Sequence, residues 1–285
     1  MSERVAIIGG GKIGEALLAG LLSSGKPARD LAIVERSAER AAELADEYKV
    51  LVSDIPTATE HAQVVVIAVK PDAVDSVLAE LGKVEDNNDV ERVTVTLVAG
   101  LPAAKYENAL PAGSPVIRVM PNMPLLVNEA MSALSPGRYA TEEQVKVVSD
   151  LLAAVGKVMV VPEHLMDAVT AISGSGPAYV FLLAESMIDA GVALGLTRAQ
   201  AAEMAKQTIR GAGAMLTESG MTSTDLRAAV TSPGGTTAAA ISELERGGLR
   251  SAMYEATAAA AARSAQLSRR SELEGSSGNG GDGRK

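Results

Sequence analysis

Short runs of aliphatic residues recur along the first part of the chain, and segments with helical spacing separate them. Runs of this length that are apolar at successive positions are typical of strands buried on both faces of a parallel sheet. The predicted strands cover residues 4–8, 31–35, 64–69, 93–98, 116–119 and 159–161. The predicted helices between them cover residues 15–24, 38–48 and 72–82. This alternation predicts an α/β domain of the Rossmann type, with a mostly parallel doubly wound sheet, over residues 1–162.

The pattern changes after Pro162, where long segments rich in alanine, leucine and methionine follow one another without a convincing alternating strand. Thr197 and Thr222 stand where a hydroxyl would cap a helix start. The predicted helices cover residues 165–172, 177–194, 198–217, 223–230, 236–246 and 249–268. We therefore expect an all-α domain over residues 163–270 and a disordered low-complexity tail over residues 271–285.

Composition and charge limit the partners and the chemistry. The net charge is −9 and no basic run is present, which argues against nucleic-acid binding. The lack of cysteine excludes thiolate catalysis and cysteine-based zinc sites, and it fits a reducing, cytoplasmic compartment. The chain shows no signal-peptide pattern and no apolar run near the ~20 residues that span a membrane. The predicted helices over 177–194 and 249–268 are apolar on more than one face, which predicts a homodimer.

A glycine-rich loop lies between the first predicted strand and the first predicted helix. In this loop Gly9 permits a tight turn, Gly11 lets a pyrophosphate approach the backbone, and Gly14 lets helix and strand pack closely. Lys12 and Ile13 lie within the same loop and are expected to contact the cofactor with it. The strand–turn–helix context predicts a dinucleotide-binding site.

The next predicted strand ends in Glu35 and Arg36. An acidic residue at this place usually bonds the ribose of NAD, whereas an arginine accommodates the 2′-phosphate of NADP. Because both residues are present, the choice between the two cofactors stays open, and Arg36 could equally be a solvated surface residue.

Small residues and prolines follow two further strands, at the edge where doubly wound sheets bind ligands. They would let the nicotinamide half of a cofactor lie against the backbone. These candidate cofactor residues are Ala68, Val69, Lys70, Pro71, Ala99 and Gly100. Lys70 could serve the cofactor or close its own loop. Asn122, in a turn stiffened by two prolines, could position the nicotinamide or the substrate, or belong to a rigid loop that joins the sheet to the second domain.

A second candidate site lies near the start of the predicted helix over 236–246. A Pro-Gly-Gly turn precedes that helix, whose first turn carries hydroxyls and unpaired backbone N–H groups, and such a helix start binds anions. A dinucleotide site together with a small-anion site predicts a two-substrate enzyme. The two histidines, His61 and His164, belong to no recognisable triad or metal cluster, so no metal site is predicted.

Five segments carry a resemblance to the pyrroline-5-carboxylate reductase family over nearly all of residues 3–268. They are Ile-Gly-Gly-Gly-Lys-Ile-Gly (8–14), Ala-Val-Lys-Pro (68–71), Val-Met-Pro-Asn-Met-Pro (119–124), Asp-Ala-Val-Thr-Ala-Ile-Ser-Gly-Ser-Gly-Pro-Ala-Tyr (167–179) and Thr-Ser-Pro-Gly-Gly-Thr-Thr (231–237). The last two segments, in this order and spacing, are the most specific.

The resemblance implies reduction of 1-pyrroline-5-carboxylate to L-proline with NADPH or NADH, the final step of proline synthesis. It also implies a Rossmann domain, a helical dimerisation domain and frequently a ring of dimers. By the same resemblance the substrate carboxylate rests on the turn that contains Ser232, Gly234, Gly235, Thr236 and Thr237. It further places the catalytic Thr237 hydroxyl near the ring nitrogen and Glu163 near the ligand. Some relatives have an asparagine that touches the cofactor ahead of the third strand, where this chain has Ile55.

The implied chemistry agrees with the available side chains. A protonated cyclic imine is a strong hydride acceptor, so its reduction needs an aligned nicotinamide, a held carboxylate and one proton, but no nucleophile or metal. Two other classes compete with this reading. Hydroxyacid dehydrogenases share the glycine loop but usually carry a catalytic lysine in the second domain, where Lys206 is the only lysine between residues 158 and 284. A nucleotide-binding regulatory or scaffold protein could use the same fold without catalysis.

Overall fold

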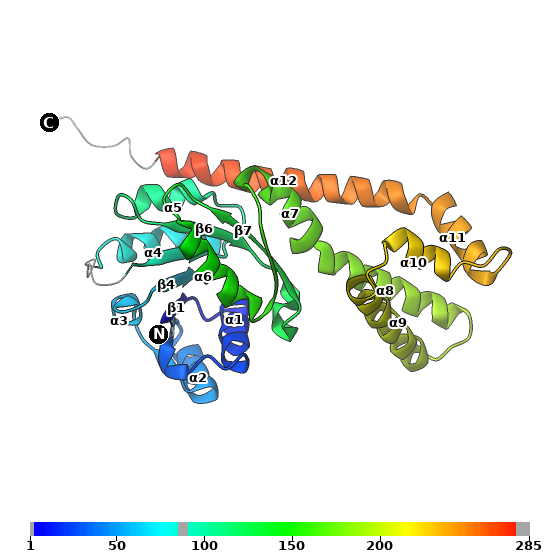
Figure 1. Cartoon of the computed structure of the whole chain (residues 1–285), viewed down its shortest axis with the longest axis horizontal. Helices are drawn as coiled ribbons and strands as arrows, with labels where there is room; N and C mark the ends of the chain where they lie inside the picture. The colour runs from blue at the N-terminus through cyan, green and yellow to red at the C-terminus, as the bar shows by residue number, and fades with distance from the viewer. Residues whose placement is uncertain (1–2, 85–90, 278–285) are drawn as a thin grey trace. The chain divides into compact units, whose positions relative to one another are not determined.

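The computed structural model describes residues 3–84 and 91–277, with side chains to residue 269 (Figure 1). Its contacts divide the chain into two compact units. The sheet unit comprises residues 1–174 and 260–285, and the helical unit comprises residues 175–259. Within the described residues, no helix combines the length and the apolar character that a bilayer-spanning segment requires.

Eight strands of the described residues form one sheet in the order β3-β2-β1-β4-β5-β6-β7-β8. Every neighbouring pair is parallel except β6 and β7, which run antiparallel. The strands are β1 (Val5–Ile8), β2 (Leu31–Val34), β3 (Leu51–Val52), β4 (Val64–Ile67), β5 (Val93–Thr96), β6 (Val116–Met120), β7 (Ala130–Pro136) and β8 (Gly156–Val160). The predicted Rossmann-type sheet is confirmed, because β1 and β4 lie side by side at the point where the strand order reverses.

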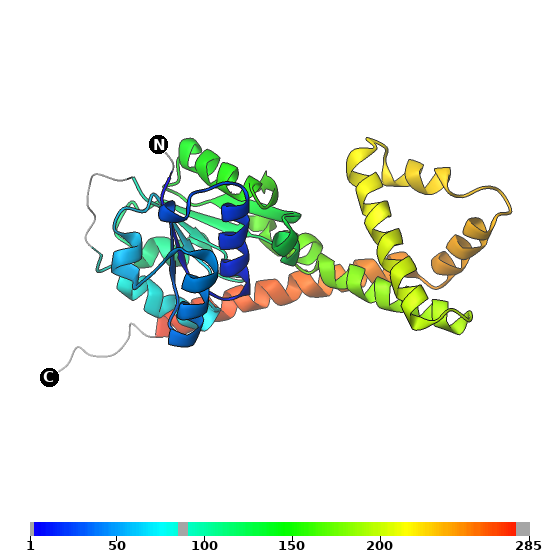
Figure 2. The same cartoon turned by 90° about the horizontal axis from the view of Figure 1, so that it is seen from below.

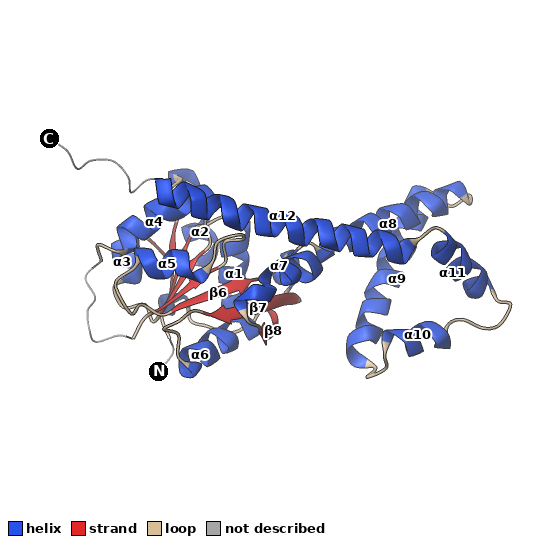
Figure 3. Ribbon diagram, turned by 90° about the horizontal axis from the view of Figure 1, so that it is seen from above, coloured by secondary structure: helices blue, strands red, loops and turns tan. Residues whose placement is uncertain are grey.

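Successive residues of the central strands bury their side chains in two different cores. In β1, Ile7 belongs to the core that contains Leu17 of α1, whereas Ile8 belongs to the core that contains Tyr106 of α5. Because a strand alternates its faces residue by residue, an uninterrupted apolar run follows directly from burial on both sides. Helices flank the red strands on both faces in Figure 3. They are α1 (Lys12–Ser23), α2 (Ala38–Tyr48) and α6 (Glu142–Ala153) on one core, and α3 (Ile55–Thr59), α4 (Val74–Leu81) and α5 (Ala103–Ala109) on the other.

Two strands and three helices of the sheet unit differ from the predicted pattern. β7 escaped prediction because Ser132 and Ser135 interrupt its apolar run, although both serines are buried. β3 has only two residues, which is too short for a periodic signal. The short or mostly polar helices α3, α5 and α6 escaped prediction as well.

The helical unit agrees closely with the helices predicted for it. Thr197 accepts a hydrogen bond from the Gln200 amide and Thr222 accepts one from the Asp225 amide, as expected of caps. Ser175 precedes α8 but its side chain makes no capping bond. The helices are α8 (Gly176–Ala193), α9 (Arg198–Glu218), α10 (Ser223–Ala229), α11 (Thr236–Arg246) and the first part of α12 (Leu249–Ser277).

Contacts group the start of the predicted second domain with the sheet unit. The Ser264 hydroxyl of α12 donates to Asp167 Oδ1 at 2.6 Å, within the same unit. The domain boundary at residue 163 remains a prediction. Helix α12 continues to Ser277, beyond the predicted tail start at residue 271, because the preceding residues are good helix formers. Residues 278–285 of that predicted tail lie outside the described residues.

We expect Gly14→Ala to destabilise the chain strongly, because a Cβ there would collide with the carbonyl oxygen of Gly9. The carbonyl oxygen is a backbone atom and cannot rotate away as a side chain can. The collision is therefore relieved only if α1 moves off β1, at a cost of about 3 kcal/mol. Gly11→Ala is the matched control, because a Cβ at Gly11 meets nothing within 4 Å. Its cost should stay below about 1 kcal/mol. Urea unfolding at fixed protein concentration measures both, and equal midpoints for the two variants would contradict the packing role of Gly14.

Candidate active site

A cavity of about 700 Å³ opens at the carboxyl ends of β1, β2 and β4. This is the crevice beside the reversal of strand order, where doubly wound sheets bind ligands. Seven predicted cofactor residues line it, namely Gly9, Gly11, Glu35, Arg36, Ala68, Val69 and Lys70. The other predicted cofactor residues do not line it, namely Lys12, Ile13, Gly14, Pro71, Ala99, Gly100 and Asn122.

The glycine loop has the geometry of a phosphate site. Gly9 has a φ of +115°, which favours glycine, and a Cβ there would lie 2.6 Å from the Ala68 carbonyl oxygen. Helix α1 begins at Lys12 after Gly11, and no side chain caps it. The first intrahelical donor is the Glu15 amide, which bonds the Gly11 carbonyl at 2.9 Å. The three N–H groups before it have no partner within the helix, and with the helix dipole they favour an anion.

Glu35 braces this loop from the neighbouring strand end. Its two carboxylate oxygens accept the Gly10 amide at 3.0 Å and the Ser37 amide at 2.9 Å. Each oxygen keeps a further lone pair, so Glu35 can still accept a ribose hydroxyl. Arg36 is exposed and makes no hydrogen bond or ion pair within the described part of the chain. Neither side chain is excluded from its predicted role, and the cofactor choice between them stays open.

The cavity has a far wall of which the sequence pointed only to Ile55, where some relatives have an asparagine that touches the cofactor. Ile55 is the first residue of α3, and Ser53 and Asp54 lie between α3 and β3, a strand too short to be predicted. The rest of that wall follows Lys70 along η2 (Pro71–Ala73) and α4, and consists of Asp72, Ala73, Ser76, Val77 and Glu80. Lys70 itself is exposed, and its carbonyl closes the η2 turn through the Ala73 amide at 3.0 Å.

Asn122 is held on both sides of its amide. Its Nδ2 donates to the Ser173 carbonyl at 3.0 Å and its Oδ1 accepts the Met131 amide at 2.9 Å. These bonds tie the end of β6 to β7 and to the Ser-Gly-Ser-Gly segment. They favour the rigid-loop alternative for Asn122, while its contact with a cofactor stays a prediction.

Glu163 lies at the start of η4 (Glu163–Leu165) and uses one oxygen twice. Its Oε1 accepts the Ala103 amide at 2.8 Å and lies 3.3 Å from Arg118 Nη1. Its side chain is 37% exposed. Glu163 therefore has a structural partner on each side, and its Oε2 has no recorded partner among the described residues.

The predicted anion turn of the helical unit also leads into an uncapped helix. Figure 2 shows this turn in the loop between the yellow α10 and the orange α11. Helix α11 begins at Thr236, and no side chain caps it. The Gly235 amide donates to the Ser232 carbonyl at 3.1 Å, and Gly234 has a φ of +68°. The free amides are therefore those of Thr236, Thr237 and Ala238, and Ala238 was not among the predicted site residues. The amide of Gly235, which was among them, is already bonded.

The described residues contain no group of three or more histidine, aspartate and glutamate side chains that could hold a metal. His61 is exposed, with Nε2 4.0 Å from a Glu60 oxygen. The two predicted anion sites share one feature, a helix start with unpaired backbone amides, at α1 in the sheet unit and at α11 in the helical unit. Such sites suit binding and orientation of charged ligands more than nucleophilic attack.

Comparisons with known proteins agree with this geometry. Residues 163–267 match the family model described as pyrroline-5-carboxylate reductase dimerisation, and residues 4–100 match the one described as NADP oxidoreductase, coenzyme F420-dependent. A pyrroline-5-carboxylate reductase of Mycobacterium tuberculosis is 50% identical, over 93% of this chain and 96% of the relative. The corresponding protein of Arabidopsis thaliana is 39% identical, over 94% of this chain and 96% of the relative.

Solved structures show the same relationship. A pyrroline-5-carboxylate reductase from Coxiella burnetii superposes with a TM-score of 0.89 at 32% identity, covering 94% of this chain and 99% of that one. A pyrroline carboxylate reductase of Plasmodium falciparum with NADP bound superposes with a TM-score of 0.82 at 29% identity, covering 93% and 98%. The chain belongs to the pyrroline-5-carboxylate reductase family.

Proposed function

We propose that the chain performs the reaction of its family with two backbone anion sites, the loop 9–14 for the cofactor and the turn 232–237 for the substrate. The reaction is the reduction of 1-pyrroline-5-carboxylate to L-proline by NADPH or NADH, the last step of proline synthesis. The observation that carries the assignment of roles is that α1 and α11 both begin without a side-chain cap. Each of these helix starts leaves backbone N–H groups unpaired and able to bind an anion.

The sheet unit fits a dinucleotide. The open space at Gly11, the residue before α1, admits a pyrophosphate. The unpaired amides of the first turn of α1 point out of that same end of the helix. A nicotinamide cofactor, when bound, supplies the hydride. Glu35 can accept a ribose hydroxyl and Arg36 can neutralise a 2′-phosphate, so the rim serves either form of the cofactor.

The helical unit supplies groups suited to the substrate. The amides of Thr236, Thr237 and Ala238 hold the carboxylate, with the Ser232 hydroxyl beside them. The Thr237 hydroxyl is half-buried and makes no hydrogen bond within the described residues. It orients the ring nitrogen and relays to it the proton that the nitrogen takes up from solvent. Glu163, a residue of the sheet unit, keeps Oε2 as an acceptor for the ligand. Because the imine is already electrophilic when protonated, these residues orient the substrate and hold its charge.

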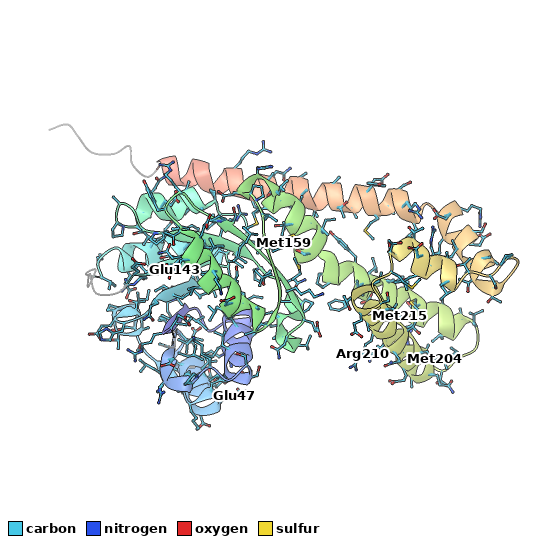
Figure 4. All side chains as sticks on the ribbon, viewed as in Figure 1. Glu47, Glu143, Met159, Met204, Arg210 and Met215 are labelled. Carbon is cyan, nitrogen blue, oxygen red and sulfur yellow. The ribbon has the colours of Figure 1, made fainter. Side chains whose placement is uncertain are left out.

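The dimerisation match indicates that the chain forms oligomers, and the helical unit shows a surface suited to this. Helix α8 has no buried residue, and its Phe181 and Leu182 are 58% and 63% exposed. On α9, Met204 and Met215, which Figure 4 labels, are about half exposed. We place a second copy of the chain on these apolar faces, with a ring of such dimers as a further step.

The reaction is tested by imine-dependent oxidation of NADPH and NADH, followed by absorbance. We expect turnover of 1-pyrroline-5-carboxylate and a kcat/KM at least about 100-fold lower for 1-pyrroline, which lacks the carboxylate that the amides of α11 hold. Equal turnover of both imines would remove the carboxylate site. Cofactor binding without any imine turnover would instead favour the nucleotide-binding regulatory protein.

Thr237→Ala should lower kcat/KM by about 10- to 100-fold, because it removes one hydrogen bond to a charged group. Thr237→Ser keeps the hydroxyl and should recover most of the activity. Thr236→Ala is the matched control, since it leaves the backbone amide and the neighbouring hydroxyl in place. Steady-state kinetics decide, and an unchanged kcat and KM in Thr237→Ala would assign the hydroxyl no role.

Light scattering at micromolar concentration should give the mass of a dimer or of a multiple of it. Phe181→Asp should reduce that mass by placing a charge on the apolar face of α8. Leu51→Asp, at a residue of the edge strand β3 that is also half exposed, is the control and should leave the mass unchanged. A monomeric mass of the unaltered chain would contradict the predicted dimer.

A further inference from the structure

Arg118 is a buried cation in the middle of a strand. It lies on β6, paired with Thr96 of β5 and Ser135 of β7, and is 5% exposed. Its Nη1 meets Glu163 Oε1 at 3.3 Å, and its Nη2 is buried without a hydrogen-bond partner among the described residues. Buried charges with unpaired donors destabilise a fold, and an apolar side chain of similar size is often tolerated better. Sheet stability therefore gives no reason for an arginine at this position.

The guanidinium of Arg118 contacts Glu163, and Glu163 in turn contacts the start of α5, where the loop from β5 ends. The Glu163 oxygen that faces Arg118 also accepts the amide of Ala103 at 2.8 Å. Ala103 is the first residue of α5, and the last four residues of the connection from β5 stand directly before it. Those four residues include Ala99 and Gly100, the predicted contacts of the nicotinamide. A continuous chain of polar contacts thus runs from Arg118 to the start of this helix.

Two further contacts hold the same loop. A Cβ at Gly100 would lie 3.2 Å from Leu267 Cβ, so α12 lies directly against the loop backbone. At the end of β5, the Val98 amide donates to Thr96 Oγ1, which lies 2.6 Å from the hydroxyl of Tyr106. Burial raises the pKa of Tyr106 to about 12, so its hydroxyl stays neutral while it accepts the hydrogen bond that the Thr96 hydroxyl donates. Ala99 is left exposed at the strand end while Gly100 is buried.

We propose that Arg118 is a positioning residue for hydride transfer, which acts through Glu163 to fix the loop 99–103 beneath the nicotinamide ring. The inference rests on the proposed function, and on the predicted contact of the cofactor with Ala99 and Gly100. This proposal gives Glu163 two roles, because its Oε1 holds the loop in place and only its Oε2 is left for the substrate. The pyrophosphate is held elsewhere, at the start of α1. Arg118 therefore governs alignment of the ring while the affinity for the cofactor comes mainly from the glycine loop.

Arg118→Met tests this separation of alignment from affinity. We expect kcat to fall by about 10- to 100-fold, because small misplacements of a reacting group are costly. The Kd of NADPH should change less than about 2-fold, and the urea midpoint should not fall, because a buried charge has been removed. Arg118→Lys can still reach Glu163 and should recover part of kcat. Lys146→Met, which breaks the exposed pair with Asp150, is the control and should leave kcat unchanged.

Glu163→Ala should lower kcat at least as far as Arg118→Met does, because it removes Oε2 from the substrate as well as Oε1 from the loop. The double variant should be no worse than Glu163→Ala, because Arg118 acts on the loop through Glu163. Hydrogen exchange of the segment 97–106 should be faster in both variants, whether or not imine turnover is detected. An unaltered chain that turns over no imine would contradict the proposed function. Unchanged exchange and kcat in Arg118→Met, or a fall in kcat matched by lost stability in both Arg118 variants, would overturn the positioning role.

Discussion

The close approach of helix α1 to strand β1 is the constraint on which the site of the sheet unit depends. Gly14 lies against the carbonyl of Gly9, so no side chain separates the helix from the strand end. Gly11 at the start of α1 has no side chain to cap the helix, and the amides of the first turn remain unpaired beside a cavity of about 700 Å³. Glycine at two positions thus lets the helix pack closely and leaves its start uncapped, with unpaired amides that favour an anion.

The proposed sites meet the negative charge of their ligands with backbone amides, while several cations of the chain are paired with its own acids. Arg40 bonds Glu15 and Glu43, which raise the pKa of its guanidinium, and Arg118 bonds Glu163. Helix α11 repeats the device of α1 in the helical unit, with an uncapped start after a glycine turn. A chain with a net charge of −9 can thus bind two anionic ligands without a basic surface.

Patterns repeated over neighbouring residues were predictable, and contacts between distant residues were not. The strands β1, β4 and β5 were evident because both faces are buried, whereas the buried serines of β7 hid that strand. The glycine loop and the start of α11 could be located from local sequence alone. The wall around Asp54 follows a strand of two residues, and the pair of Arg118 with Glu163 joins positions 45 residues apart. Neither leaves a local signal, because register and tertiary packing bring those groups together.

The most direct test of the two backbone anion sites is a crystal structure of the full chain with NADP⁺ and L-proline bound. The pyrophosphate should accept hydrogen bonds from the amides of the loop 9–14, and the proline carboxylate from the amides of residues 236–238. The Thr237 hydroxyl should then lie within hydrogen-bond distance of the ring nitrogen. A carboxylate held instead by side-chain cations, with the start of α11 empty, would contradict the assignment.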